Sequence, residues 1–358
     1  MRESMRQVSV FAFALTALLT TGAISPLYAE IESGGVVKAD ACASDPKLLG
    51  VSRVVEVDTA GGADIGGDRK NAQHFLNDGE VVLTFDDGPS RADTKAILKA
   101  LADQCTKATF FMVGQMALAD PQMVREVAAS GNTIGTHTWS HKNLRFAKAD
   151  VMHQQIESAI STVSKANGAP IAPLFRFPYL SSSRTADDYL KSRSIGAVWV
   201  DVDSKDYMTR NPDVVRKRIL AELVKAKKGI ILMHDIHAWT AKMLPDLLAE
   251  LHDKGFKVVH MVPKAHAQTI ALYDAAAEKA IAAKTAARAA NPMASRALVW
   301  SMTPAPATKH RAWKASKKLH AKGSIVTGSA GFAAGSAKAQ KNGKAKGEDP
   351  PWQFNVFN

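Results

Sequence analysis

A regular alternation of short apolar runs and helical segments constrains the fold more than any other feature of this sequence. The segments between the runs carry helix signals, such as an N-cap residue followed by proline at Asp120-Pro121 and Asn211-Pro212. Such alternation predicts an α/β fold with a largely parallel sheet, and seven units suit a closed or nearly closed (β/α) barrel. An open doubly wound sheet is the alternative. The apolar runs are 81–85, 108–113, 132–136, 173–177, 197–201, 230–233 and 256–262.

The N-terminal residues have the layout of an export signal. Arg2 and Arg6 precede an uncharged run at 8–21, and a small-residue site ends at Ala29. This pattern predicts a secretory signal peptide over 1–29, with cleavage after Ala23 or an uncleaved anchor as alternatives. We therefore expect an exported protein of the periplasm, the cell envelope or the extracellular space, with no transmembrane span after cleavage.

The remaining chain divides by composition into four parts. A glycine-rich N-terminal extension (30–77) with a strand-like run at 52–59 precedes the α/β domain (78–266) and an alanine-rich helix (267–291). Residues 292–358 contain eleven Lys or Arg and two acidic residues, which gives a net charge of +9 and leaves +3 of the total +12 for everything else. Such a basic tail with few large apolar residues is expected to be disordered. It could contact an anionic envelope polymer or be only a solvated linker; no nucleic-acid partner is expected.

The two cysteines allow one disulfide bond. Cys42 and Cys105 could pair in an oxidising compartment and so tie the N-terminal extension to the domain. A buried free Cys105 is the alternative. Neither residue lies in a CxxC cluster, so the sequence does not predict a cysteine-bound zinc.

Two adjacent carboxylates end the first apolar run. Asp86 and Asp87 follow Phe85 directly and precede the turn pair Gly88-Pro89. Carboxylates at the exit of a buried strand lose hydration and repel each other, unless a cation or a proton is shared there. The pair therefore predicts metal binding or acid–base chemistry, with helix capping by one Asp as the alternative.

Titratable residues follow four further runs, where the carboxyl ends of parallel strands would form one site. His137 and His141 can face the same side of a helical turn, and two imidazoles with one carboxylate form a common set for a catalytic metal. Arg176 can hold a carboxylate base ionised, and His234 can act as a general acid with an acidic partner such as Asp203. Weaker candidates, expected to fix loops or to support these groups, are Asp201, Asp206, Asp235 and His237.

Five segments together resemble the motifs of the polysaccharide deacetylase family, the NodB-homology or carbohydrate esterase 4 group. They are TFDDGPS, HTWSH, RFPY, DVDSKDY and LMHD, and the resemblance spans roughly 80–264. It implies a distorted (β/α) barrel and a metal-dependent hydrolase that removes acetyl groups from N-acetylated sugars of a polysaccharide. Zinc is the metal that it favours, with cobalt or nickel also possible. It implies the following roles: Asp86 the catalytic base, Asp87, His137 and His141 the metal ligands, Arg176 the residue that orients the base, Tyr179 an oxyanion donor through its backbone N–H, His234 the acid with Asp203 as its partner, and Leu232 a wall of the acetate pocket.

Two positions depart from the family pattern. The fourth motif usually ends in Trp where this chain has Tyr207, and the third usually continues with Gly where it has Leu180. Both departures are expected to reshape the wall that faces the sugar, so Tyr207 is a candidate substrate-binding residue. The substrate polymer stays open between peptidoglycan, chitin oligomers and an exopolysaccharide.

Three other functions compete with N-deacetylation. An esterase of the same fold acting on O-acetyl sugars would use the same residues. A catalytically silent carbohydrate-binding protein would not need an acid, a base and a metal set together. An iron oxygenase with two His and one carboxylate is disfavoured by the α/β pattern and by the additional acid and base.

Overall fold

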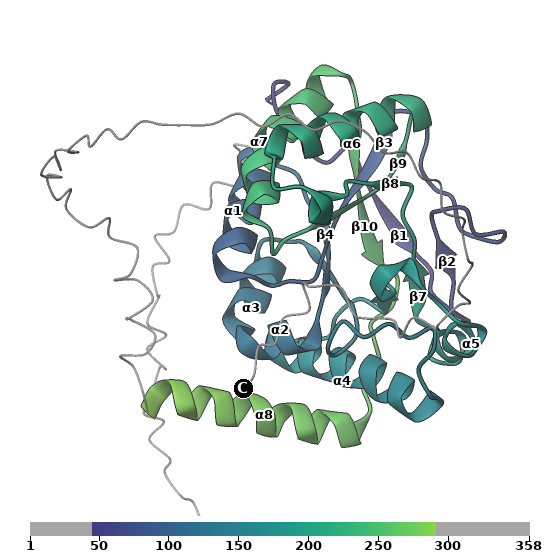
Figure 1. Cartoon of the computed structure of the whole chain (residues 1–358), viewed down its shortest axis with the longest axis vertical. Helices are drawn as coiled ribbons and strands as arrows, with labels where there is room; N and C mark the ends of the chain where they lie inside the picture. The colour runs from purple at the N-terminus through teal and green to yellow at the C-terminus, as the bar shows by residue number, and fades with distance from the viewer. Residues whose placement is uncertain (1–44, 291–358) are drawn as a thin grey trace, which may run out of the picture. The chain divides into compact units, whose positions relative to one another are not determined.

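In a computed structural model of the protein, residues 45–290 are described, and they form one ten-stranded sheet with helices on its outer side (Figure 1). Every pairing between the strands is parallel. The main path runs β1-β10-β3-β4-β5-β6-β7-β2, and β9 joins β3 to β8. The strands are β1 Arg53–Val57, β2 Asp64–Ile65, β3 Glu80–Asp86, β4 Thr109–Met112, β5 Thr133–Thr136, β6 Leu174–Phe175, β7 Gly196–Val198, β8 Val202–Asp203, β9 Gly229–His234 and β10 Lys257–Pro263.

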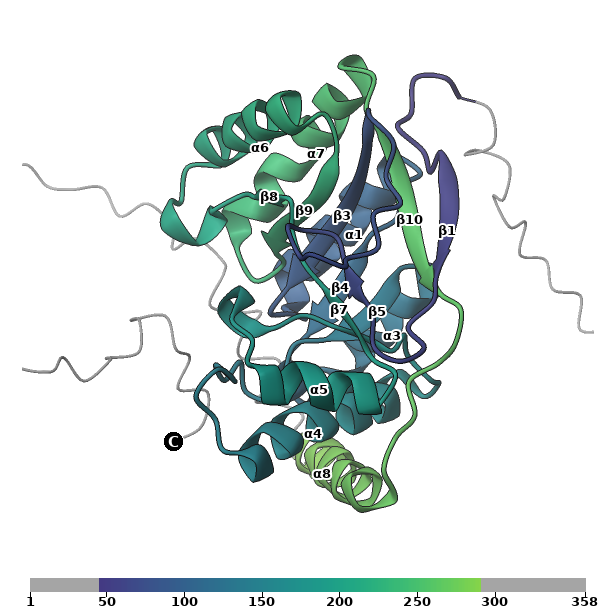
Figure 2. The ribbon, with the colours of Figure 1, turned by 90° about the vertical axis from the view of Figure 1, so that its right-hand side faces the viewer.

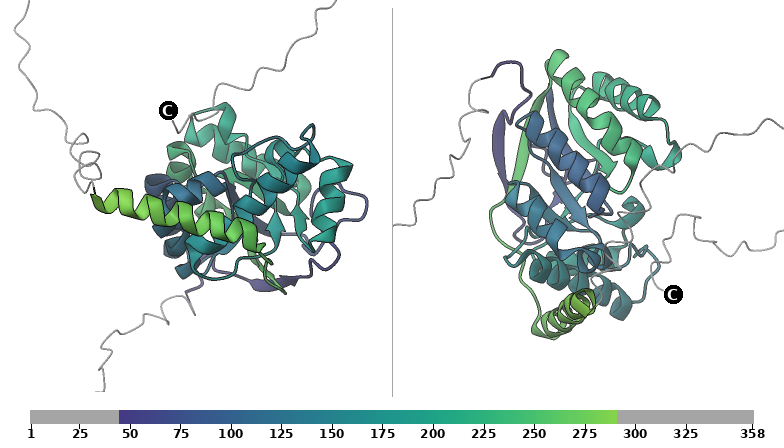
Figure 3. Two further views of the ribbon diagram at one scale, coloured as in Figure 1. Left: turned by 90° about the horizontal axis from the view of Figure 1, so that it is seen from below. Right: turned by 90° about the vertical axis from the view of Figure 1, so that its left-hand side faces the viewer.

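Helices α1 to α7 lie in the connections between strands, and the helices cover the outer side of the sheet (Figures 1 and 2). Helix α8 packs against α4, and Figure 3 shows it crossing the underside of the domain when viewed from below. The α-helices are α1 Arg91–Asp103, α2 Gly114–Ala119, α3 Pro121–Ala129, α4 Ala149–Asn167, α5 Arg184–Ser192, α6 Pro212–Ala226, α7 Ala238–Asp253 and α8 Ala271–Ala290; the short turns η1 Pro178–Leu180 and η2 Asp206–Met208 are 3₁₀.

Strand β3 shows how the fold orients the residues of the site. Val81, Leu83 and Phe85 pack into the large core between sheet and helices, whereas Val82 packs into a second, inner cluster with Phe111 and Ile230. Because side chains alternate along a strand, Thr84 and Asp86 point to the same inner side as Val82. The last residue of this strand therefore brings a carboxylate to the mouth of the barrel interior.

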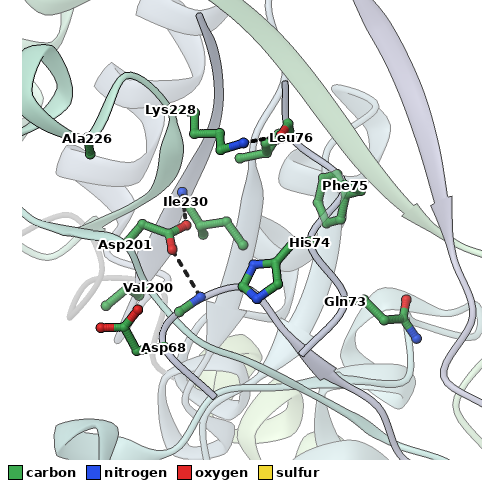
Figure 4. A pocket seen from close by; sticks show the side chains of 12 residues that line it. Asp68, Gln73, His74, Phe75, Leu76, Val200, Asp201, Ala226, Lys228 and Ile230 are labelled. Carbon is green, nitrogen blue, oxygen red and sulfur yellow. Dashed lines mark hydrogen bonds between the residues drawn. The ribbon is translucent and has the colours of Figure 1, made fainter. Parts of the chain in front are cut away.

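The barrel has a seam between β2 and β7 on one side and β8 and β9 on the other. A cavity of about 380 Å³ lies at this seam (Figure 4). Asp201 bridges the two sides, because its carboxylate accepts hydrogen bonds from the Gly67 N–H at 3.0 Å and the Ile230 N–H at 2.7 Å. Lys228, which also lines the cavity, donates to the Leu76 carbonyl at 2.9 Å. The two hydrogen bonds of Asp201 therefore hold the two sides of the seam together.

The structure confirms the α/β class, and each of the seven predicted runs contains a strand. Residues 45–77, expected to be an extension, contribute β1 and β2 to the same sheet. Two short strands, β2 and β8, were not predicted. Helix α6 ends with Lys227 as its C-cap residue, which takes the left-handed conformation (φ 66°), and Gly229 begins β9. Among residues 45–290, no helix is both long and apolar enough to cross a bilayer.

Three expectations fall on residues that the structure does not describe. The signal peptide (1–29) and the basic tail (292–358) lie wholly outside the described range, and so does Cys42. Cys105 is not a free cysteine, which excludes the alternative of a free thiol there. The pairing of Cys42 with Cys105 stays a prediction.

Candidate active site

Asp86 is the last residue of β3, and it contacts a buried arginine. The Arg176 guanidinium donates from one nitrogen to Asp86 Oδ1 at 2.8 Å and to Thr84 Oγ1 at 2.7 Å, and its Nε donates to the Val198 carbonyl at 3.1 Å. Arg176 is fully buried, and its guanidinium lies over the Phe111 ring, 4.2 Å from the ring centroid. Burial raises the pKa of Asp86 to about 6, although Arg176 and His234 favour its ionised form. A carboxylate held in this way can accept a proton near neutral pH.

Asp87 turns away from the strand toward two histidines. Its backbone is left-handed (φ 79°), which directs its carboxylate differently from that of Asp86. Asp87 Oδ1 lies 3.6 Å from His137 Nε2 and 3.3 Å from His141 Nε2. Opposite this group, Asp86 Oδ2 lies 3.8 Å from His137 Nε2. The structure therefore brings together the three residues expected to hold a metal, with Asp86 beside them.

The donor set of Asp87, His137 and His141 fits a divalent cation. Asp87 Oδ1 is buried without a hydrogen-bond partner, which is costly for a carboxylate unless a cation neutralises it. The Nδ1–H of His137 donates to the Arg176 carbonyl at 2.7 Å, so the unprotonated Nε2 faces Asp87. Burial lowers the pKa of His137 to about 3, which keeps it neutral. Ligand atoms in a tetrahedral zinc site lie about 3.4 Å from one another, close to the distances found here.

His234 is the second titratable centre, and the structure corrects its expected partner. Asp203 was predicted to hold it, but His234 Nδ1 donates to Asp206 Oδ1 at 2.6 Å. Asp206 Oδ2 also accepts from the His234 N–H at 2.8 Å and from the Thr240 hydroxyl at 2.7 Å. Burial alone would lower the pKa of His234, but the Asp206 carboxylate raises it to about 10. His234 is therefore held protonated, 4.0 Å from Asp87.

Asp203 contacts a different residue. Its carboxylate accepts from the Lys205 N–H at 2.9 Å and from the Tyr207 hydroxyl at 2.9 Å. The Tyr207 ring lies edge-on to His234, with centroids 5.7 Å apart, and is 44% exposed. The prediction failed because spacing along DVDSKDY does not show which carboxylate returns to the site. Lys205 is left-handed (φ 51°), and this turn sends Asp206 back toward β9.

His237 and Asp206 form a second group of possible metal ligands with His234. Their ligand atoms lie within 4.8 Å of one another. However, both oxygens of Asp206 already accept hydrogen bonds, and the His234 Nδ1 proton occupies the position that a cation would need. His237 stacks on Trp239, with centroids 4.4 Å apart. This group is a hydrogen-bonded support for His234 rather than a cation site.

Two other predicted residues lie beside these groups. Leu232 pairs in register with Thr84, as His234 pairs with Asp86, so its buried side chain points inward one step below those of His234 and Asp86. The Tyr179 ring lies 4.8 Å from that of His141. Tyr179 and Leu180 are both left-handed, with φ of 60° and 50°. A glycine at position 180 would adopt this conformation without strain, which gives a physical reason for the glycine that the family pattern has there.

Asp235 has a larger role in the structure than the sequence indicated. It is 1% exposed, accepts from the Thr94 hydroxyl at 2.6 Å, and packs its carboxyl group against Gly88. Burial raises its pKa to about 7. Asp235 therefore fixes the turn that follows Asp86 and Asp87, a contact between residues far apart in sequence that no local pattern could reveal.

We expect Gly88→Ala to lower kcat/KM about tenfold or more while the protein stays folded. A Cβ at this position would overlap the Asp235 carboxyl group, so the turn that carries Asp87 must shift. Asp235→Ala removes the overlapping atoms. In a double-mutant cycle, Gly88→Ala should therefore cost less in the Asp235→Ala background than in the wild type. Equal costs in the two backgrounds would contradict this account.

Comparisons with known proteins agree with the geometry. A model of the family described as polysaccharide deacetylase matches residues 76–198. The chain is 31% identical over 179 residues to a peptidoglycan-N-acetylglucosamine deacetylase of Listeria monocytogenes, across 50% of this chain and 37% of that protein. It is 31% identical over 160 residues to a chitooligosaccharide deacetylase of Azorhizobium caulinodans, across 44% of this chain and 75% of that protein.

A solved structure extends the similarity to the fold. The peptidoglycan deacetylase of Bdellovibrio bacteriovorus superposes with a TM-score of 0.55 at 30% identity, across 61% of each chain. The present chain spans little more than a third of the length of the Listeria relative, so the similarity concerns the domain and not that whole protein.

Proposed function

Because the chain belongs to the polysaccharide deacetylase family, we propose that it is a metal-dependent hydrolase that releases acetate from N-acetylated sugars of a polysaccharide. One observation carries the proposal. A metal-ligand set, a base held by a buried arginine and an acid held by a buried carboxylate meet at one edge of the sheet. A carbohydrate-binding protein would need neither the base nor the acid.

Each group has a definite part in the proposed reaction. A divalent ion held by Asp87, His137 and His141 would polarise the acetamide carbonyl and make a bound water more acidic. Asp86 would accept a proton from the water that attacks the carbonyl carbon, and Arg176 keeps the carboxylate in place. The Tyr179 N–H donates to the oxyanion. His234 gives its proton to the sugar nitrogen as the C–N bond breaks, which releases acetate and a free amine. Leu232 lines the acetate methyl pocket.

The finer parts of the proposal concern the metal, the substrate and the location. Zinc suits a set of two imidazoles and one carboxylate, and cobalt or nickel can take the same ligands. The names of the relatives favour peptidoglycan or chitin oligosaccharides as substrate. The signal-like N-terminus supports export to the cell envelope, where the basic tail would contact an anionic polymer.

The test is acetate release by the purified protein on N-acetylglucosamine oligomers, peptidoglycan and acetylxylan. We expect release from at least one N-acetyl substrate, loss of release after chelation, and recovery with added zinc or cobalt. Release from acetylxylan alone would indicate an esterase. Sugar binding without release, with metal bound, would indicate a carbohydrate-binding protein and overturn the proposal.

A further inference from the structure

An arginine-lined groove lies next to the candidate active site. It has a volume of about 480 Å³. Two of its walls come from segments that leave the site directly: Leu180 follows Tyr179, and Arg145 is four residues from His141, a reach of at most about 14 Å of extended chain. The groove residues are Arg69, Arg145, Phe146, Leu180, Ser181, Ser182, Ser183, Arg184 and Trp199.

The groove has cationic groups that are available to a ligand. Its lining contains three arginines and no acidic residue. Arg145 is exposed, and within residues 45–290 no carboxylate lies at ion-pair distance from it. Arg184 is 96% exposed and meets Asp188 only at 3.8 Å, a contact that water and salt weaken strongly. Lys142 and Lys148 add positive charge on the same exposed segment as Arg145.

The third arginine of the groove, Arg69, is held in place by contacts with neighbouring residues. Arg69 donates to Asp187 at 3.0 Å and to Ser182 at 3.3 Å, and its guanidinium lies 4.1 Å from the centroid of the Trp199 ring. Phe146, in contrast, is 86% exposed at the rim. The Arg145 guanidinium lies over this ring, 5.7 Å from its centroid. An exposed aromatic ring beside exposed guanidinium groups suits a sugar that bears a negative charge, because the ring can stack on the sugar and the arginines can bind the acid.

The wall of the groove that lies nearest to the candidate active site contains a strained residue, Leu180. Leu180 holds a left-handed conformation that disfavours a residue with a side chain, directly after Tyr179 in the same region. The Leu180 side chain lies at the groove wall. The chain then continues through Ser181 and Ser182 to Ser183, the N-cap of α5. Strained residues persist where the surrounding structure or function requires them.

We propose that this groove is a subsite for a carboxylate-bearing sugar adjacent to the sugar that is deacetylated. This inference rests on the proposed function and narrows it to acidic glycans, such as a peptide-free chain of alternating N-acetylglucosamine and N-acetylmuramic acid, in which the lactyl carboxyl of the muramic residue is free. The lactyl carboxylate of the muramic residue binds Arg145 and Arg184, and Phe146 contacts the sugar ring. A neutral chitin oligomer gains the stacking contact alone.

The test uses a peptide-free tetrasaccharide of this alternating chain and the same tetrasaccharide with its carboxyl groups converted to methylamides. For the double variant Arg145→Gln/Arg184→Gln we expect kcat/KM to fall about tenfold on the acidic form and less than twofold on the neutral form. Added salt should remove the preference of the wild type. Arg210→Gln is the matched control, because Arg210 is also exposed but lies outside the groove, beside Trp239.

Binding of both tetrasaccharides, measured by calorimetry, separates this inference from the proposed function. Tighter binding of the acidic form that depends on Arg145 and Arg184 supports the subsite even if no acetate is released. Acetate release with no preference between the forms, or equal losses on both in the double variant, overturns the subsite and leaves the deacetylase proposal standing.

Discussion

Replacement of Asp86 by Asn is expected to lower kcat about a thousandfold or more while metal binding is retained. The substitution removes the proposed proton acceptor, since an amide cannot take the proton of the attacking water. Asp87, His137 and His141 are left unchanged, so the proposed set of metal ligands stays intact. The measurements are kcat from acetate release and metal stoichiometry by elemental analysis of the dialysed protein.

Asp93→Asn serves as the control for this variant. Asp93 lies in the first turn of α1, and its carboxylate accepts from the Ser90 hydroxyl at 3.1 Å rather than from Arg176. It should therefore keep kcat within a few-fold of the wild type. Turnover near the wild-type level in Asp86→Asn would refute the assignment of the base, and loss of the metal would mean that Asp86 is a ligand.

The second large effect is expected at Asp206, compared with its neighbour Asp203. Asp206→Asn should lower kcat about a hundredfold, because the amide leaves His234 without the carboxylate that holds its Nδ1 proton and favours its charged form. Asp203→Asn should change kcat only a few-fold, because Asp203 acts on Tyr207. Steady-state kinetics of both variants on one N-acetyl substrate make the comparison.

The pH dependence of kcat separates a change in the pKa of His234 from a purely structural effect, which would not shift that dependence. Asp206 raises the pKa of His234, so its removal lowers that pKa and the protonated acid is lost at a lower pH. The alkaline limb of activity should therefore shift toward neutral pH in Asp206→Asn and stay in place in Asp203→Asn. The reverse pattern would restore Asp203 as the partner of His234.

Local sequence patterns predicted most of the strands and placed the candidate site residues at strand ends. The apolar run 81–85 predicted β3, and its abrupt end at Asp86 and Asp87 placed two carboxylates at a strand exit. The same reasoning placed His137, Arg176 and His234 at neighbouring exits, because parallel strands end at one edge of the sheet. Side-chain alternation then explains why Asp86 points inward.

Other features depended on contacts between distant segments. Asp206 rather than Asp203 reaches His234 because Lys205 turns the chain back, and Asp235 holds Gly88 across nearly 150 residues. The groove joins Arg69, Arg145 and Arg184 from three separate segments. Strand period and helix caps act within a few residues, so the sequence alone determined the elements and the residue types at their ends. Which of those side chains meet depends on left-handed turns and on packing between elements, and only the tertiary structure decided that.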